Sequence, residues 1–231
     1  MPQAAFFFDI GQTLVTGAPA SPRRLLGAAL HLNEDQTKAV GKLMMTLNAE
    51  NPETISEAMA QLLPSIERTT LAREVRRVWH DQIACVRQIP EATPLIRRLK
   101  EAGHCVGLIS NIWHPFFLGF QKACGEIDAL VDFRFLSYRA GVKKPSESLY
   151  QQALGAARRH GLDRCWMIGD SYELDIAPAR RVGMHSLWIL CRPERERPVL
   201  AEILNGNIPA PDGCVPELKD VLGFLKERGW L

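Results

Sequence analysis

The segment FFFDIGQTL, residues 6–14, sets a carboxylate directly behind a run of phenylalanines. A short apolar run of this kind predicts a fully buried β-strand. A carboxylate at the end of such a strand costs free energy unless a metal ion or a cationic side chain compensates it. Asp9 is therefore the first candidate for a functional residue.

Polar groups recur at corresponding places in three later segments. Ser110 and Asn111 follow the apolar run CVGLI, Lys144 precedes Pro145 at the start of a helix-like stretch, and Asp170 and Asp175 follow the run WMIG. In a doubly wound sheet the binding crevice lies at the carboxyl ends of the strands. We therefore expect these groups to converge with Asp9 at one edge of a sheet.

Composition limits the possible functions. The chain has 231 residues, 46% of them hydrophobic, which is enough for an α/β domain with an insertion. A net charge of +2 argues against a nucleic-acid partner. The six cysteines form no C-x-x-C pair, so neither a zinc site nor a disulfide framework is expected. Without a long apolar segment or room for a signal peptide before the first strand, we expect a cytoplasmic protein with no membrane partner, either monomer or homodimer.

Two kinds of pattern divide the chain. Residues 17–88 predict helices only: one after Ser21, one from Asn33 to about Ala49, one near 53–63 and one from about residue 69 to 86. Residues 1–16 and 89–231 predict alternating strands and helices, with strands near 105–110, 133–136, 165–168 and 186–190. The intervening helices are expected near 91–102, 115–124, 145–160 and 174–182, with a last one near 217–228. The segment 192–198 is interpreted as a charged, proline-bounded loop.

This alternation is typical of a parallel, doubly wound α/β sheet with right-handed crossovers. The polar segments, in their order, resemble the four motifs of the haloacid dehalogenase (HAD) superfamily. Residues 9–14 match the first motif, Ser110 the second, Lys144-Pro145 the third, and Gly169-Asp170 with Asp175 the fourth. The resemblance implies a Rossmann-like core at 1–16 and 89–231, a helical cap at 17–88, and a phosphatase-like hydrolase activity.

The resemblance also assigns roles to single residues. Asp9 is expected to attack phosphorus and form an aspartyl-phosphate. Mg²⁺ is the implied cofactor, held by the carboxylates of Asp9 and Asp170 and by the backbone carbonyl of Gly11. A small phosphorylated molecule is the implied substrate.

The remaining motif residues are expected to support that chemistry. Ser110 offers a hydroxyl to the phosphate, Asn111 a further donor, and Lys144 a positive charge beside Asp9. Asp175 is expected to hold the side chain of Asp170 or Lys144 in position without contacting the metal ion itself.

Gly11 departs from the family pattern. Phosphatases of the family usually carry there a second aspartate, which protonates the leaving group and then activates the hydrolytic water. A positioned acid or base is worth roughly a hundred- to ten-thousand-fold in rate. Gln12 could orient a water, and His114 is the first candidate for a replacement acid, ahead of three cap residues: His80, Asp81 and Glu57. Otherwise we expect good leaving groups, such as aryl or acyl phosphates, to be favoured.

Three alternatives remain open at this point. A haloacid-dehalogenase-like enzyme would attack carbon without Mg²⁺, and such enzymes usually lack the Gly169-Asp170 pair that is present here. A phosphonoacetaldehyde-hydrolase-like enzyme would need a cap lysine for a Schiff base, and the cap offers Lys38 and Lys42. The third alternative is a catalytically weakened HAD fold that binds a phosphorylated ligand without turnover.

Overall fold

The computed structural model describes residues 3–231 and contains a six-stranded, fully parallel sheet. The strand order is β5-β4-β1-β6-β7-β8, so the strand that precedes Asp9 lies between the strands that precede Ser110 and Asp170. This confirms the predicted doubly wound α/β fold. The strands are β1 (Ala5–Phe8), β4 (Cys105–Ser110), β5 (Phe133–Leu136), β6 (Cys165–Gly169), β7 (His185–Ile189) and β8 (Gly213–Val215).

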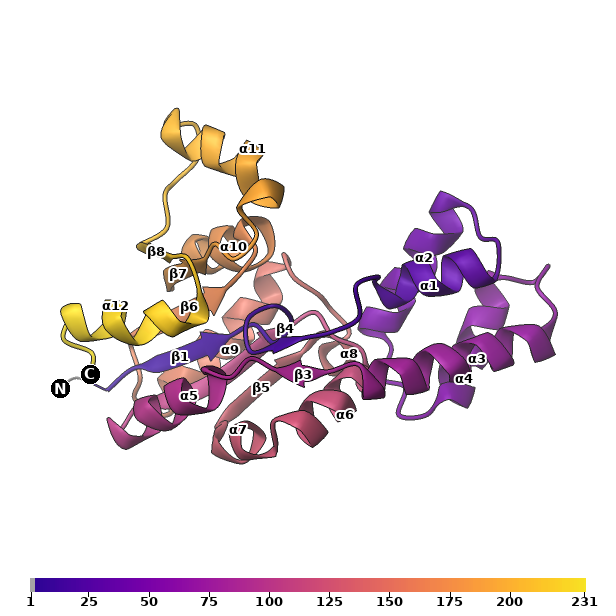
Figure 1. Cartoon of the computed structure of the whole chain (residues 1–231), viewed down its shortest axis with the longest axis horizontal. Coiled ribbons are helices and arrows are strands. Elements are labelled where there is room, and N and C mark those ends of the chain that lie inside the picture. The colour runs from indigo at the N-terminus through magenta and orange to yellow at the C-terminus, as the bar shows by residue number, and fades with distance from the viewer. Residues whose placement is uncertain (1–2) are drawn as a thin grey trace.

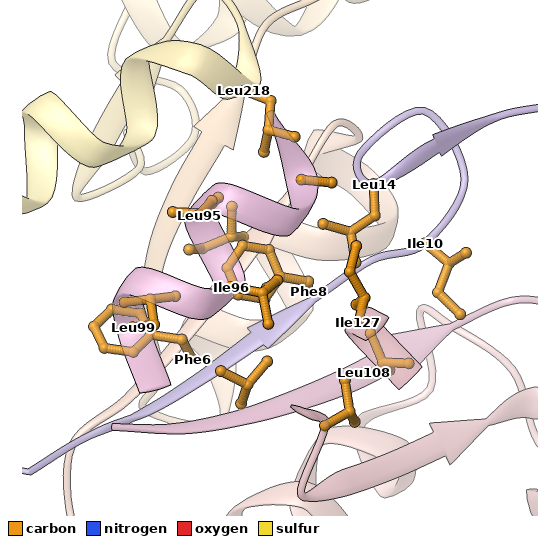
Figure 2. Packing of buried hydrophobic residues seen from close by; sticks show 14 of the residues in the cluster. Phe6, Phe8, Ile10, Leu14, Leu95, Ile96, Leu99, Leu108, Ile127 and Leu218 are labelled. Atoms are coloured by element: carbon orange, nitrogen blue, oxygen red, sulfur yellow. The ribbon is translucent and has the colours of Figure 1, made fainter. Parts of the chain in front are cut away.

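Alternate side chains of β1 enter the two hydrophobic layers on either side of the sheet. Phe6 and Phe8 pack on one face with Leu95, Ile96 and other residues of the same cluster, as Figure 2 shows. Phe7 points to the opposite face. The period-two geometry of a strand explains why a continuous apolar run is needed when both faces are covered.

Helices cover both faces of the sheet. The layer that meets Phe6 contains α5 (Ala92–Glu101), α6 (His114–Ala123), α7 (Gly125–Leu130) and α12 (Val221–Glu227). The opposite layer contains α9 (Glu147–Arg159) and α10 (Ala177–Arg181). The sequence did not predict the short helices α7 and α8 (Ser137–Ala140), nor strand β8.

The helices predicted for the first third of the chain form a separate group at one end of the molecule (Figure 1). They are α1 (Pro22–Ala29), α2 (Glu34–Thr46), α3 (Pro52–Leu62) and α4 (Arg68–Ala84), and they share their own buried cluster. The strands β2 (Val15–Thr16) and β3 (Arg87–Gln88) pair antiparallel where the chain leaves and re-enters the core. The boundaries proposed for the core and the cap, at residues 16/17 and 88/89, lie next to this ribbon.

Local sequence explains where the cap helices start. The side chain of Asn33 accepts a hydrogen bond from the N–H of Gln36, whose own side chain accepts from the N–H of Asn33. Asn51 accepts from the N–H of Thr54 in the same way. Each bond satisfies a backbone donor that the first turn of a helix leaves unpaired.

One segment was predicted wrongly. Residues 192–198, expected as a loop, begin helix α11 (Pro193–Leu204). Pro193 occupies the first helical position, where a missing N–H costs nothing. Pro198 lies inside the helix, but Val199, Leu200 and Ile203 pack on a small cluster with Tyr172 and Trp188. Tertiary packing therefore outweighs the local signal.

Residues 3–231 contain neither a disulfide nor a helix that could cross a membrane. No cysteine in this part of the chain forms a disulfide. None of its helices combines the length and the apolar character that crossing a membrane requires.

Candidate active site

A cavity of about 380 Å³ lies between the carboxyl ends of the central strands and the cap. The core contributes its polar wall. The cap contributes Met45 of α2, Gln82 of α4 and residues of its first segment, namely Gly17, Ala18, Ala20, Ser21 and Pro22. The core side chains that line it are Asp9, Gln12, Ser110, Asn111, Ile112, Trp113, Phe116, Lys144, Asp170, Ser171, Leu174, Asp175, Arg192 and Arg195. The four predicted motifs therefore meet in one place.

Lys144 connects two carboxylates at the bottom of this cavity. Its Nζ lies 2.6 Å from Oδ1 of Asp9 and 2.5 Å from Oδ1 of Asp175, and donates to the carbonyl of Ile109 at 3.1 Å. These contacts use all three ammonium donors. Burial alone would lower the pKa of Lys144, but the carboxylates of Asp175 and Asp9 raise it above its usual value. The lysine is thus a fixed cation that holds the Asp9 carboxylate.

Asn111 holds Lys144 through the backbone. Its Oδ1 accepts from the N–H of Lys144 at 2.7 Å, and its Nδ2 donates to the carbonyl of Lys144 at 3.0 Å. The following loop is held by Ser137, whose hydroxyl contacts both the N–H and the carbonyl of Ile112 at 3.0 Å. Asn111, predicted to contact substrate, has its main protein contacts with the lysine instead.

Asp175 is the most deeply buried of the three acids. Its second oxygen accepts from the N–H of Ser171 at 3.0 Å, and its side chain is 1% exposed. A Cβ atom at position 169 would lie 2.4 Å from its Cγ, so only glycine leaves room for this carboxylate. Burial raises the pKa of Asp175 to about 6, and Asp9 adds to the increase against the attraction of Lys144. Of the two predicted contacts, Asp175 makes the one with Lys144.

Asp170 has a cationic partner that the sequence analysis did not identify. Arg192 lies in the loop after strand β7. Its guanidinium contacts Oδ2 of Asp170. The carbonyl of Asp170 accepts from the indole N–H of Trp188 at 3.2 Å, which fixes the backbone. Burial lowers the pKa of the Arg192 guanidinium, as does the neighbouring Arg195.

The acids fit a divalent metal ion. One oxygen each from Asp9, Asp170 and Asp175 lie within 4.8 Å of one another, and all three residues are buried. Among residues 3–231, two cations contact these three carboxylates, Lys144 and Arg192. The cluster therefore lacks one positive charge, and an uncompensated buried charge is costly. Carboxylate oxygens are ligands that Mg²⁺ prefers.

The turn after β1 leaves open space beside Asp9. A Cβ at Gly11 would meet no atom within 4 Å. Gln12 follows with φ of 63°, a left-handed conformation that costs a non-glycine residue roughly 1–2 kcal/mol. Its N–H donates to the carbonyl of Val15 at 2.6 Å, which closes the turn. Ser110, at the end of the neighbouring strand β4, lines the same cavity, so its hydroxyl can meet a ligand.

Comparison with known families agrees with this geometry. The model of the haloacid dehalogenase-like hydrolases matches residues 3–183, more than half of the chain. The chain belongs to this family. It is therefore a HAD-like hydrolase, as the four motifs predicted.

Named relatives of this hydrolase are phosphatases. The glyceraldehyde 3-phosphate phosphatase of Pyrococcus abyssi is 31% identical over 107 residues, which are 46% of this chain and 44% of that protein. The alignment thus spans less than half of that relative. The protein of the same name from Methanothermobacter thermautotrophicus is 24% identical over 201 residues, 80% of this chain and 84% of its own length.

Solved structures of low sequence identity share the fold. A 2-haloacid dehalogenase from Pseudomonas syringae pv. Tomato superposes with a TM-score of 0.63 at 18% identity, covering 98% of this chain and all of that one. A HAD family enzyme from Bacteroides thetaiotaomicron, in complex with magnesium and inorganic phosphate, superposes with a TM-score of 0.60 at 14% identity, covering 81% and 94%.

None of the candidates for a replacement acid lines the cavity of this HAD-like hydrolase. The ring of His114 stacks on Trp79, with 5.9 Å between centroids, and meets Tyr138 edge-on at 5.3 Å. Burial lowers the pKa of His114, which favours the neutral imidazole. His80, Asp81 and Glu57 of the cap are likewise absent from the lining. Among residues 3–231, the carboxyl groups that line the cavity belong to Asp9, Asp170 and Asp175.

The cap lysines do not reach the cavity either. Lys38 forms an ion pair with Glu34 at 2.7 Å and its side chain is 61% exposed. Lys42 does not line the cavity. Neither amine is therefore placed to form a Schiff base with a ligand beside Asp9.

Some of the missed residues carried a usable signal. Arg192 comes after Leu190 and Cys191 in the loop that follows strand β7, so it lies at the same edge of the sheet as Ser110 and Asp170, and the rule that found the motifs applies to it as well. Met45 and Gln82 carried none, because helical periodicity places them in the cap without saying which residues face the core.

Proposed function

We propose that this HAD-like hydrolase is a Mg²⁺-dependent phosphatase that transfers the phosphoryl group of a small substrate to Asp9. The observation that carries the proposal is the position of Asp9. Its carboxylate lines a cavity, is held by Lys144 at 2.6 Å, and shares a three-carboxylate cluster with Asp170. A nucleophile, a metal-binding pair and a fixed cation are the parts that phosphoryl transfer requires.

Each residue has a distinct task in this mechanism. Asp9 attacks phosphorus and becomes an aspartyl-phosphate, which water then hydrolyses. Asp9, Asp170 and the carbonyl of Gly11 would hold the metal ion, which supplies neutralisation of charge on the phosphoryl oxygens. Ser110 donates its hydroxyl to the phosphoryl group, and Lys144 keeps the Asp9 carboxylate in place.

The leaving group must depart with little help from a proton donor. Gly11 has no acidic side chain, and His114 packs between Trp79 and Tyr138 outside the cavity lining. Substrates whose leaving groups are stable as anions, such as aryl or acyl phosphates, are therefore favoured over alkyl phosphates. Equal rates on both substrate types would contradict this expectation.

The relatives make one alkyl phosphate a specific test compound. Two of them carry the name glyceraldehyde 3-phosphate phosphatase. We include glyceraldehyde 3-phosphate in the substrate panel beside acetyl phosphate and 4-nitrophenyl phosphate. The cavity of about 380 Å³ is compatible with small substrates of this kind.

The proposal is tested by phosphate release from this panel, with Mg²⁺ and with excess chelator, for the unchanged protein and for Asp9→Asn. We expect turnover that needs Mg²⁺ and that Asp9→Asn lowers by about 10⁴-fold or more. The isosteric substitution preserves shape while removing the nucleophile. Turnover that survives Asp9→Asn would show that another residue, or a contaminating enzyme, performs the reaction.

A second candidate function is phosphoryl-ligand binding without catalysis. It is favoured by one observation: the described part of the chain, residues 3–231, places no carboxyl group at the cavity beyond the three acids of the cluster. This alternative predicts that inorganic phosphate binds with Mg²⁺ in isothermal titration while no member of the panel is turned over. Turnover above that of Asp9→Asn would reject it.

A further inference from the structure

The space beside Gly11 belongs to a cavity that Arg192 also lines. A side chain at position 11 would meet nothing within 4 Å, although the family's second acid would stand there. The segment after β7 lies against the same turn, because the thiol of Cys191 contacts the carbonyl of Gln12 at 3.7 Å. Arg192 starts from this point, and its side chain lines the cavity as far as Asp170.

The guanidinium of Arg192 is only partly used by the protein. Its Nη2 contacts Asp170, whereas Nη1 has no hydrogen bond and Nε is buried without a partner among residues 3–231. The side chain is 33% exposed. Arg195 lies further out, with 59% of its side chain exposed and its Nε 3.9 Å from Glu196. Arg192 is thus less exposed than Arg195 and, unlike Lys144, keeps guanidinium N–H groups that are unpaired within the described residues at the cavity that contains Asp9.

We propose that Arg192 contacts the leaving group and makes acyl phosphates the preferred substrate class. This inference rests on the proposed phosphatase function. An arginine keeps its proton at all ordinary pH values, so it offers charge and hydrogen bonds but no proton. The leaving group that fits such a partner is a carboxylate, because its two oxygens match the planar fork of a guanidinium. A phenolate offers a single oxygen.

The reaction balances without an acid. An oxygen of Asp9 forms a bond to phosphorus, the bond between phosphorus and the acyl oxygen breaks, and the electron pair leaves with the carboxylate beside Arg192. Water then attacks phosphorus of the aspartyl-phosphate, and the bond between phosphorus and the Asp9 oxygen breaks, which restores the Asp9 carboxylate and releases dihydrogen phosphate. The dihydrogen phosphate carries both protons of the water, so no side chain has to keep a proton at the end of the cycle.

The test compares benzoyl phosphate with 4-nitrophenyl phosphate, both assayed with Mg²⁺. We expect Arg192→Gln to lower kcat/KM for benzoyl phosphate by about tenfold or more beyond its effect on 4-nitrophenyl phosphate, as the loss of hydrogen bonds to a charged group implies. Arg192→Lys keeps the charge without the planar fork, so its kcat/KM for benzoyl phosphate should lie between those of the unchanged protein and Arg192→Gln. The matched control is Arg197→Gln, an exposed arginine of the same helix that does not line the cavity.

Each outcome decides the inference. An equal loss on both substrates would mean that Arg192 acts only through Asp170, and no loss on either substrate would mean that it does not meet the leaving group; either result rejects the proposal. If the unchanged protein hydrolyses neither compound, nor any other member of the substrate panel, the phosphatase function itself fails. In that case benzoate binding in the presence of inorganic phosphate, measured by isothermal titration, still decides whether Arg192 binds a carboxylate, since Arg192→Gln should abolish it.

Discussion

The two walls of the cavity differ in chemistry. The wall built from the core carries the charged residues Asp9, Lys144, Asp170, Asp175, Arg192 and Arg195, whereas the cap wall is uncharged and consists of Gly17, Ala18, Ala20, Ser21, Pro22, Met45 and Gln82. The charged wall sits on buried parallel strands that fix their side chains, while the cap consists of helices joined to the core by a short ribbon. Catalysis is thus expected to reside in the core, and the cap to control access and shape.

Removing the central cation should have the largest effect. Lys144→Met leaves Asp9 and Asp175 as buried carboxylates without their shared partner, which should lower the free energy of unfolding by about 3–5 kcal/mol. Urea denaturation at pH 7 measures the loss. The double variant Lys144→Met/Asp175→Asn should recover part of it, because one of the two stranded charges is then absent.

The matched control comes from the cap. Lys38 pairs with Glu34 at 2.7 Å on an exposed helix face, so Lys38→Met should cost less than about 0.5 kcal/mol. If the two lysine variants lost similar amounts of unfolding free energy, the ion pairs of Lys144 would contribute no more to stability than an exposed pair of the cap.

Restoring the family's acid tests the chemistry of the same wall. Gly11→Asp enters open space, so the fold should tolerate it. A positioned acid should raise kcat for glyceraldehyde 3-phosphate by about a hundredfold or more, with a smaller gain for 4-nitrophenyl phosphate, which needs less help. No rise on the alkyl phosphate would mean that proton donation was never limiting.

The close packing of Gly169 against Asp175 can be tested by adding one methyl group. Gly169→Ala would set its Cβ 2.4 Å from Asp175, and the overpacking should lower the free energy of unfolding by roughly 1–3 kcal/mol. Thermal denaturation measures the change. Gly125→Ala is the control, because a Cβ there meets no atom within 4 Å and should alter stability little.

The sequence predicted the charged wall better than the rest for a physical reason. A carboxylate or lysine behind an apolar run is costly unless it has a partner, so Asp9 and Lys144 stand out from their neighbours. Strand order and parallel pairing then bring them together. The same rule missed Arg192 because two prolines and several charges made residues 192–198 resemble a loop. His114 was misjudged, since stacking on Trp79 depends on the fold and leaves no local pattern.

The cap side of the cavity offers a smaller effect. Gln82 of α4 is 2% exposed, and its Oε1 accepts from the indole N–H of Trp113 at 3.3 Å. Gln82→Leu would leave that buried donor without a partner and should cost about 1 kcal/mol in urea denaturation. Leu62→Ala, at a 45% exposed position of the cap, is the control and should cost clearly less. An equal loss would mean that this contact does not couple the cap to the core.

The smallest effect concerns the boundary between the two walls. Burial lowers the pKa of His114 below the usual 6.5, so the unfolded chain takes up a proton before the folded one does. This histidine therefore reduces stability as the pH falls through 6.5, and above that pH it contributes no such loss. His114→Phe keeps the stacking on Trp79 without the charge. Its free energy of unfolding should decline less between pH 7 and pH 5 than that of the unchanged protein. Parallel pH curves for His114→Phe and the unchanged protein would show that the imidazole titrates alike in both states, and that the core edge under the cap is open to water.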